Sequence, residues 1–242
     1  MIGFNMYFLL AIFLIAGMVW SVWFKKLTLW GAITGGVCAL LVFAGAGFTG
    51  LGMMTAFFVA GTAATSWRAA DKKKLEIIDD ERTGRKAGQV LANAGVAAIA
   101  GGFAIAFPEY RSILVLAIAA CFSSATADTL ASELGTIYGK RFYNIMTWKT
   151  DNRGLDGVIS LEGTMLGIAG SLFIALIYAA GFGVSWHFAL LVAAGTVGNL
   201  ADSVLGAALE RKGLIKNDAV NFLNTLIAAL TALALQAVLV SF

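Results

Sequence analysis

The strongest constraint on this chain is a series of apolar runs of about 20 residues, the length that an α-helix needs to cross the hydrocarbon core of a bilayer. Hydrophobic residues make up 60% of the 242 positions and charged residues only 13%, whereas soluble domains carry about 25% charged residues. We therefore predict an all-α, polytopic transmembrane helical bundle that forms one integral membrane domain over residues 1–242. About eight spans are expected, at residues 4–24, 27–45, 50–66, 88–107, 112–134, 161–181, 188–209 and 219–241.

The basic residues predict the orientation of these spans. With eight alternating crossings, sixteen of the seventeen Lys and Arg residues fall on one side and only Arg111 falls on the other. Positively charged loops stay in the cytoplasm, so we expect that side to be cytoplasmic, both termini to lie opposite, and the protein to reside in the cell (inner) membrane. The net charge of +3 follows from this rule and needs no nucleic-acid partner. The longest loop, at 67–87, is interpreted over residues 71–82 as a solvated connector.

Two acids inside an apolar run are the most unusual feature of the sequence. Asp128 and Glu133 lie within the segment ATADTLASELG at 125–135, and a charged group near the centre of a membrane helix costs about 2.5–3.5 kcal/mol on insertion scales. Asp128 shares a helical face with Ser124 and Ser132, because the three positions are four residues apart. Such intramembrane acids indicate a functional site.

A second segment has a similar pattern two spans later. ADTLASELGTIYGKR at 127–141 and ADSVLGAALERKG at 201–213 share an Ala-Asp-hydroxyl start and a basic end. In the later segment Asp202 shares a helical face with Asn199 and Ser203. We interpret the likeness as a weak internal duplication, which is common in membrane proteins whose site lies between repeats.

Polar side chains from five predicted helices gather in the half of the membrane nearest the predicted cytoplasmic side. The resulting pocket would contain carboxylates, amides and hydroxyls, and such hard oxygen ligands suit Mg²⁺. Carboxylate-bound Mg²⁺ beside an Arg and a Lys suits phosphoryl or nucleotidyl transfer. Structural hydrogen bonding between helices is the alternative role for these groups. The further members of these polar stripes are Arg85, Gln89, Asn93, Glu162, Thr164, Asn221 and Asn224.

The loop between the fifth and sixth spans offers a candidate phosphate-binding turn. Glycines flank Lys149 and Asp156, and the loop leads directly into a predicted helix. Backbone N–H groups at a helix N-terminus bind phosphate readily, although the spacing of a Walker A loop is absent. Lys149 and Arg85 could instead serve only as determinants of topology.

Several ordered motifs resemble one known family. GRKAGQVLANAG, ADTLASELG, DGVISLEGT, GNLADSVLGAALE and NDAVNFLNT resemble the integral membrane family of unknown function 92, to which plant phytyl-phosphate kinase and the animal transmembrane protein 19 belong. The resemblance covers about residues 80–230 and leaves residues 1–66 as N-terminal spans. More distantly, ADTLASELGTIYGKR followed by WKT and LEGT is similar to the CTP-binding stretch of dolichol kinase and phytol kinase and to membrane cytidylyltransferases.

The resemblance implies a membrane-embedded kinase that converts an isoprenyl monophosphate, of phytyl or geranylgeranyl type, to its diphosphate. CTP or another nucleoside triphosphate would be the donor and Mg²⁺ the cofactor. Ser124, Ser132, Glu162, Asn199 and Ser203 are expected to complete the substrate-binding set. The implied roles are metal and donor-phosphate binding for Asp128, Glu133 and Asp202, nucleotide binding for Lys149, Asp156 and Thr164, and acceptor-phosphate binding for Arg85, Gln89, Asn93, Asn221 and Asn224, with Asp128, Asp202, Lys149 and Arg85 as the catalytic set.

Other functions remain open at this stage. A cytidylyltransferase that makes a CDP-lipid would use the same groups for a different transfer. A lipid-phosphate or ion transporter would use the acids for binding, but a carrier needs polar access from both faces and the predicted pocket opens to one. A non-catalytic scaffold would leave the aligned acids unexplained. The expected partners are an isoprenyl phosphate lipid, a nucleotide and the lipid bilayer, and homo-oligomer formation is left open.

Overall fold

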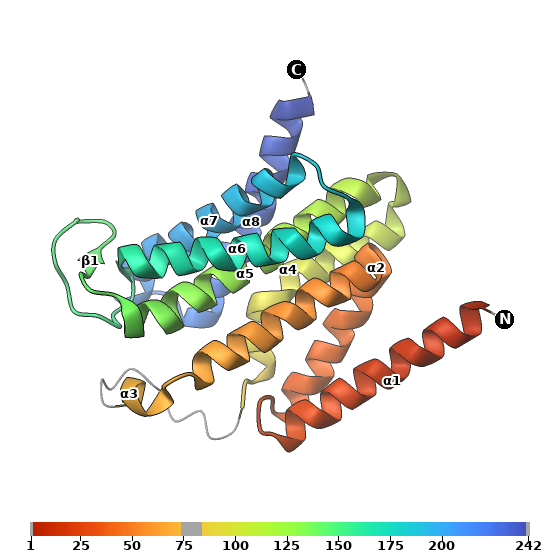
Figure 1. Cartoon of the computed structure of the whole chain (residues 1–242), viewed down its shortest axis with the longest axis horizontal. Helices are drawn as coiled ribbons and strands as arrows, with labels where there is room; N and C mark the ends of the chain where they lie inside the picture. Colours follow the sequence, from red (N-terminus) through yellow and green to blue (C-terminus); the bar gives the residue numbers. More distant parts are fainter. Residues whose placement is uncertain (1, 74–83, 241–242) are drawn as a thin grey trace.

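A computed structural model describes residues 2–73 and 84–240, which form a helical bundle with one short antiparallel strand pair (Figure 1). Within this described part, seven helices are long and apolar enough to cross a membrane, which confirms the predicted all-α transmembrane class. The elements are α1 (Ile2–Trp23), α2 (Leu29–Ser66), α3 (Ala69–Lys73), α4 (Ala87–Ala106), η1 (Pro108–Tyr110), α5 (Arg111–Tyr138), β1 (Tyr143–Asn144), β2 (Val158–Ile159), α6 (Leu161–Phe182), α7 (His187–Leu205), η2 (Gly206–Glu210) and α8 (Asn217–Val240).

Helix α2 contains the second and third predicted spans in one 38-residue segment. A straight helix of that length would hold its ends about 57 Å apart, yet Lys26 Nζ lies 3.2 Å from Ser66 Oγ. The chain therefore folds back within α2, at Gly47, where φ is 62° and ψ is −153°, a conformation open mainly to glycine. Figure 1 shows the two arms running back from this point. Seven long helices thus accommodate the eight predicted spans, because two of those spans are the arms of α2.

Arg111, the one basic residue predicted on the far side, stabilises this reversal. Its Nε donates to the carbonyl of Gly45 at 2.9 Å and its Nη2 donates to that of Ala44 at 3.2 Å. These carbonyls precede the break at Gly47, where a helix end loses its own hydrogen-bond partners. The position of Arg111 therefore has a structural reason besides charge.

Helix α5 is the most buried of the long helices and contacts α2, α4, α6, α7 and α8. Small residues allow its neighbours to approach closely, as is usual between membrane helices. A Cβ on Gly135 would lie 2.7 Å from the Cα of Gly163 on α6. One on Gly198 of α7 would collide with the side chain of Ser124. These contacts bring the polar ends of α5, α6 and α7 together.

The last five predicted spans end within a few residues of α4, α5, α6, α7 and α8. The main difference is at residues 188–209, where the α-helix ends at Leu205 and continues as the π-helical turn η2. Such π-helical turns are rare and often occur at functional sites. Nothing in the apolar pattern indicated this change.

Candidate functional site

A pocket of about 610 Å³ lies where the C-terminal ends of α5 and α7 meet the N-terminal ends of α6 and α8. Its charge is strongly unbalanced, because Lys72 is the only Lys, Arg or His among the described lining residues. A pocket of this kind attracts cations and repels free phosphate groups. The carboxylates that line it are Asp128, Glu133, Asp156, Asp202, Glu210 and Asp218.

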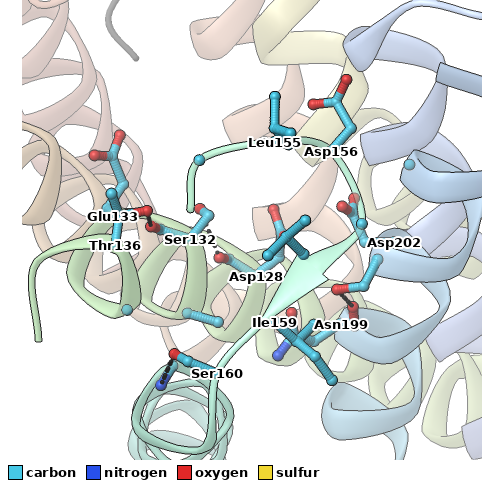
Figure 2. A pocket seen from close by; sticks show the side chains of 18 of the residues that line it. Asp128, Ser132, Glu133, Thr136, Leu155, Asp156, Ile159, Ser160, Asn199 and Asp202 are labelled. Atoms are coloured by element: carbon cyan, nitrogen blue, oxygen red, sulfur yellow. Dashed lines mark hydrogen bonds between the residues drawn. The ribbon is translucent and has the colours of Figure 1, made fainter. Parts of the chain in front are cut away.

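Asp128 of α5 and Asp202 of α7 form the centre of the pocket (Figure 2). Their carboxyl groups are in direct electrostatic contact, although they come from helices far apart in sequence. Asn224 of α8 donates a 2.8 Å hydrogen bond to Asp202 Oδ2, and its own Oδ1 accepts a 3.0 Å bond from Ser124. Asn224 and Ser124 are fully buried. They therefore hold Asp202 from behind rather than contacting a substrate.

Glu133 lies apart from this pair. Figure 2 shows it pointing away from Asp128 and Asp202. Its Oε1 accepts a 2.8 Å hydrogen bond from Thr65, and its Oε2 forms an ion pair with Lys72 of α3. Lys72 also donates to the carbonyl of Ala64 at 2.8 Å. Glu133 is therefore already compensated by protein groups.

The N-terminus of α6 lines the same pocket as the two aspartates. Ser160 caps the helix by accepting a 3.1 Å hydrogen bond from the backbone of Gly163, and both residues line the pocket with Thr164. A helix N-terminus carries a partial positive charge and unpaired N–H groups. One end of the pocket thus suits anions while the aspartates suit a cation.

The loop between α5 and α6 is held against η2. Gly157, with φ of 74°, approaches Ala207 so closely that a Cβ on Gly157 would collide with it. Arg211 Nη1 pairs with Asp151 Oδ2 at 2.6 Å and fixes the same loop from outside the pocket. Asp156 lies on this loop and lines the same pocket as Asp202. Desolvation raises the pKa of Asp156, and the charge of Arg211 opposes that rise.

Most of the predicted site residues are brought together, and several are not. Lys149 is exposed on the loop and does not line the pocket, so the structure does not bring it together with the aspartates. Glu162 accepts a bond from the backbone of Lys140, and Asn221 donates to Asn217. Arg85 and Asn93 line a separate cavity. The predicted residues that do line the pocket are Gln89, Asp128, Ser132, Glu133, Asp156, Thr164, Asn199, Asp202 and Ser203.

Lys72 is the residue that the sequence interpretation missed. It falls in the stretch 71–82, for which the sequence predicts a solvated connector, yet its side chain is only 2% exposed. Residues 74–82 of that stretch lie outside the described residues. Lys72 is followed by two further lysines, and nothing in their order distinguishes it. Its role becomes visible only when Glu133 is placed beside it.

The pocket fits Mg²⁺ through its donor chemistry. The described residues contain no cluster of three or more His, Cys, Asp or Glu side chains arranged to hold a metal, so the predicted triad with Glu133 is not formed. Mg²⁺, however, is usually held by one or two carboxylates together with substrate phosphates and water. Asp128 and Asp202 supply two such carboxylates, and no Lys or Arg among the described lining residues compensates them.

Comparison with known proteins places the chain in a family. The family described as Integral membrane protein DUF92 matches residues 10–229. Uncharacterized membrane protein sll0875 of Synechocystis sp. is 32% identical over 217 residues, which cover 88% of this chain and 84% of the relative. Uncharacterized membrane protein MJ0933 of Methanocaldococcus jannaschii is 31% identical over 200 residues, covering 83% and 82%.

A plant relative extends beyond the matched region. Protein VTE6, chloroplastic, of Arabidopsis thaliana is 30% identical over 198 residues, which cover 78% of this chain but 59% of the plant protein. No solved structure matches the chain. The family match nevertheless runs through nearly all of the described helices. The chain therefore belongs to the DUF92 family of integral membrane proteins.

Proposed function

We propose that the protein is a membrane-embedded, Mg²⁺-dependent kinase that converts an isoprenyl monophosphate to its diphosphate, with CTP or another nucleoside triphosphate as donor. The observation that carries the proposal is the Asp128–Asp202 pair, which shares a pocket with the N-terminus of α6 at one end of the bundle. The resemblance of the pocket motifs to phytyl-phosphate kinase supports the choice of substrate. The match to Protein VTE6 covers 78% of this chain and is consistent with this choice of substrate.

The chain's own groups would bind and orient the reactants. Asp128 and Asp202 would hold Mg²⁺, which when bound neutralises phosphate charge and acts as a Lewis acid. The partial positive charge at the start of α6, with the hydroxyls of Ser160 and Thr164, would attract phosphate oxygens of the donor. Asp156 and Ser203 line the same side of the pocket and would orient the donor. Catalysis of this kind depends mainly on position and charge.

The chemical step needs no strong base. An oxygen of the acceptor monophosphate attacks the γ-phosphorus of the donor and forms a new P–O bond. The bond between that phosphorus and the β-phosphate oxygen breaks, and the nucleoside diphosphate leaves. The acceptor oxygen is already ionised at neutral pH, because the second pKa of a phosphate monoester is about 6. A histidine base is therefore unnecessary, and His187, at the start of α7, does not line the pocket.

The direct test is phosphate transfer from γ-labelled CTP to geranylgeranyl monophosphate by the purified protein in lipid nanodiscs with Mg²⁺. We expect labelled geranylgeranyl diphosphate and release of CDP. Release of pyrophosphate with a CDP-lipid product would instead identify a cytidylyltransferase. Nucleotide-independent flux in proteoliposomes, without either product, would identify a transporter. For an Asp128→Asn variant, Asp71→Asn is the matched control, because Asp71 forms an ion pair with Arg68 and does not line the pocket.

A further inference from the structure

A second cavity of about 270 Å³ lies between α1, the two arms of α2 and α4. Its walls are apolar along most of their length, with Phe13 and Met18 from α1 facing Leu51 and Phe57 from α2. The wall formed by the start of α4 differs, because the polar stripe of Arg85, Gln89 and Asn93 lines it. The cavity therefore combines a hydrocarbon interior with a polar end.

The polar end of this cavity adjoins the aspartate pocket. Gln89 lines both spaces. The backbone N–H of Arg85 donates to the carbonyl of Lys26, and its carbonyl accepts from the N–H of Thr28, each at 3.0 Å. These bonds tie the start of α4 to the turn between α1 and α2. A ligand that fills the apolar cavity can therefore present its head group at Gln89, beside the aspartate pocket.

The Arg85 guanidinium lies between the second arm of α2 and α5. Its Nη2 is 3.4 Å from the position that a Cβ on Gly61 would take, and the methyl group of Thr129 is at the same distance from that position. Thr129 directly follows Asp128 on α5. Arg85 thus reaches from the apolar cavity toward the helix that carries one of the two aspartates.

We infer that the second cavity binds the single hydrocarbon tail of the acceptor lipid, with its phosphate at Gln89 and Arg85. The identity of the acceptor as an isoprenyl monophosphate rests on the proposed function. An apolar cavity whose polar end carries an arginine and two amides matches an amphiphile with one chain and one anionic head. Because Gln89 lines both spaces, a head group bound at Gln89 would lie next to the site where phosphate is transferred.

Two glycines provide a way to fill the cavity without disturbing the backbone. Gly17 of α1 has no atom within 4 Å of the position of an added Cβ, and for Gly35 of α2 the nearest atom is Val90 Cγ1 at 3.9 Å. Both line the cavity. Gly102 of α4 also has open space around it but lines neither cavity, so Gly102→Leu is a matched control.

The experiment measures nucleotide-free binding of geranylgeranyl monophosphate and of the shorter geranyl monophosphate in nanodiscs. Gly35→Leu and Gly17→Leu should weaken binding of the long chain about tenfold or more, since loss of two buried methylene contacts has roughly that effect. Binding of the short chain should stay near wild type, as should both ligands with Gly102→Leu. Retention of short-chain binding would also show that the variants are folded.

A diazirine placed near the end of the long chain gives an independent readout. We expect its photoproducts on α1, α2 and α4 residues of the cavity, and an excess of diacyl phospholipid should not displace it. Labelling confined to α6 or α7, equal losses for both chain lengths, or displacement by ordinary phospholipid would overturn the inference. Because no nucleotide is present, correct labelling without any later phosphate transfer would refute the kinase proposal alone.

Discussion

Asp128 and Glu133 lie five residues apart on the same helix and line the same pocket, but their environments differ. Glu133 is paired with Lys72 and accepts a hydrogen bond from Thr65. Asp128 faces a second carboxylate, Asp202. The first arrangement joins α5 to α2 and α3, whereas the second leaves negative charge for a ligand to neutralise. Intramembrane position alone therefore does not identify a functional acid, and the charge of its partners does.

The largest effect should follow from Asp128→Asn. This change keeps the size of the side chain and removes one of the two carboxylates that would hold Mg²⁺. We expect phosphate transfer to fall by about 100- to 1,000-fold, the loss that follows removal of one important electrostatic group. In the absence of Mg²⁺ the same variant should melt at a higher temperature than wild type, because repulsion with Asp202 is relieved.

Both measurements are needed to interpret Asp128→Asn. Transfer assays at several Mg²⁺ concentrations report the catalytic loss, and thermal unfolding without Mg²⁺ reports the relief of repulsion. A variant that transfers phosphate as fast as wild type would refute the proposed site. A lower melting temperature would mean that Asp128 is a structural residue, as Glu133 is.

The second largest effect should come from Lys72→Met, on stability. This variant removes the cation and leaves the carboxylate of Glu133 without its charged partner. Breaking a buried ion pair on one side typically costs about 3–5 kcal/mol, and the 26% exposure of the Glu133 side chain should place the loss at the lower end of that range. Chemical or thermal unfolding in a defined detergent would measure it, with Lys149→Met as a control on an exposed lysine.

A double variant separates pairing from simple loss of packing. Lys72→Met combined with Glu133→Gln should recover part of the stability lost in Lys72→Met, because no unpaired charge then remains. The coupling between the two changes is expected to exceed about 0.5 kcal/mol, as it does for residues in direct contact. Strict additivity would show that the ion pair does not stabilise the protein and that the contrast between Glu133 and Asp128 is not electrostatic.

The convergence of Asp128 and Asp202 could be predicted because helical spacing and the alternation of spans fix the depth and face of each polar residue. The reversal within α2 was predictable for the same reason. The direction of a side chain within the pocket is not set by spacing. The family resemblance predicts that Glu133 binds the metal. Its actual partner, Lys72, lies on a separate short helix that is distant in the sequence, so spacing along α5 does not reveal the pair.

Two further differences have the same origin. Asn224 was expected to contact the acceptor phosphate, but both ends of its amide are occupied by Ser124 and Asp202. Lys149 was placed near the nucleotide because it lies in a glycine-bearing loop, but it lies on the exposed part of that loop. Contacts between elements that are distant in sequence decide both cases, and no local pattern records them.

Asn224→Ala should have an intermediate effect that tests the support of the aspartate pair. The variant removes the amide that donates to Asp202 and leaves the hydroxyl of Ser124 without its buried acceptor. Residues that orient a metal ligand typically contribute 10- to 100-fold to metal affinity or activity, so we expect a loss of about that size with a higher Mg²⁺ requirement. Loss of activity with an unchanged Mg²⁺ dependence would place Asn224 outside the metal site.

The smallest effect should come from Asp151→Asn, which breaks a pair outside the membrane spans. The hydrogen bond from Arg211 lowers the pKa of Asp151 from its ordinary value. A lowered pKa means that the pair stabilises the folded protein above the unfolded pKa of about 3.9, and that this contribution is lost as the pH falls through the lower folded value. The melting temperature of the variant should therefore lie slightly below that of wild type from pH 8 to pH 5 and converge with it below pH 4.

Because exposed ion pairs contribute little, the loss of stability in Asp151→Asn should be much smaller than that in Lys72→Met. An equal or larger loss of stability in Asp151→Asn would show that burial does not determine how much an ion pair stabilises the protein. The contrast between Glu133 and Asp128 assumes that it does.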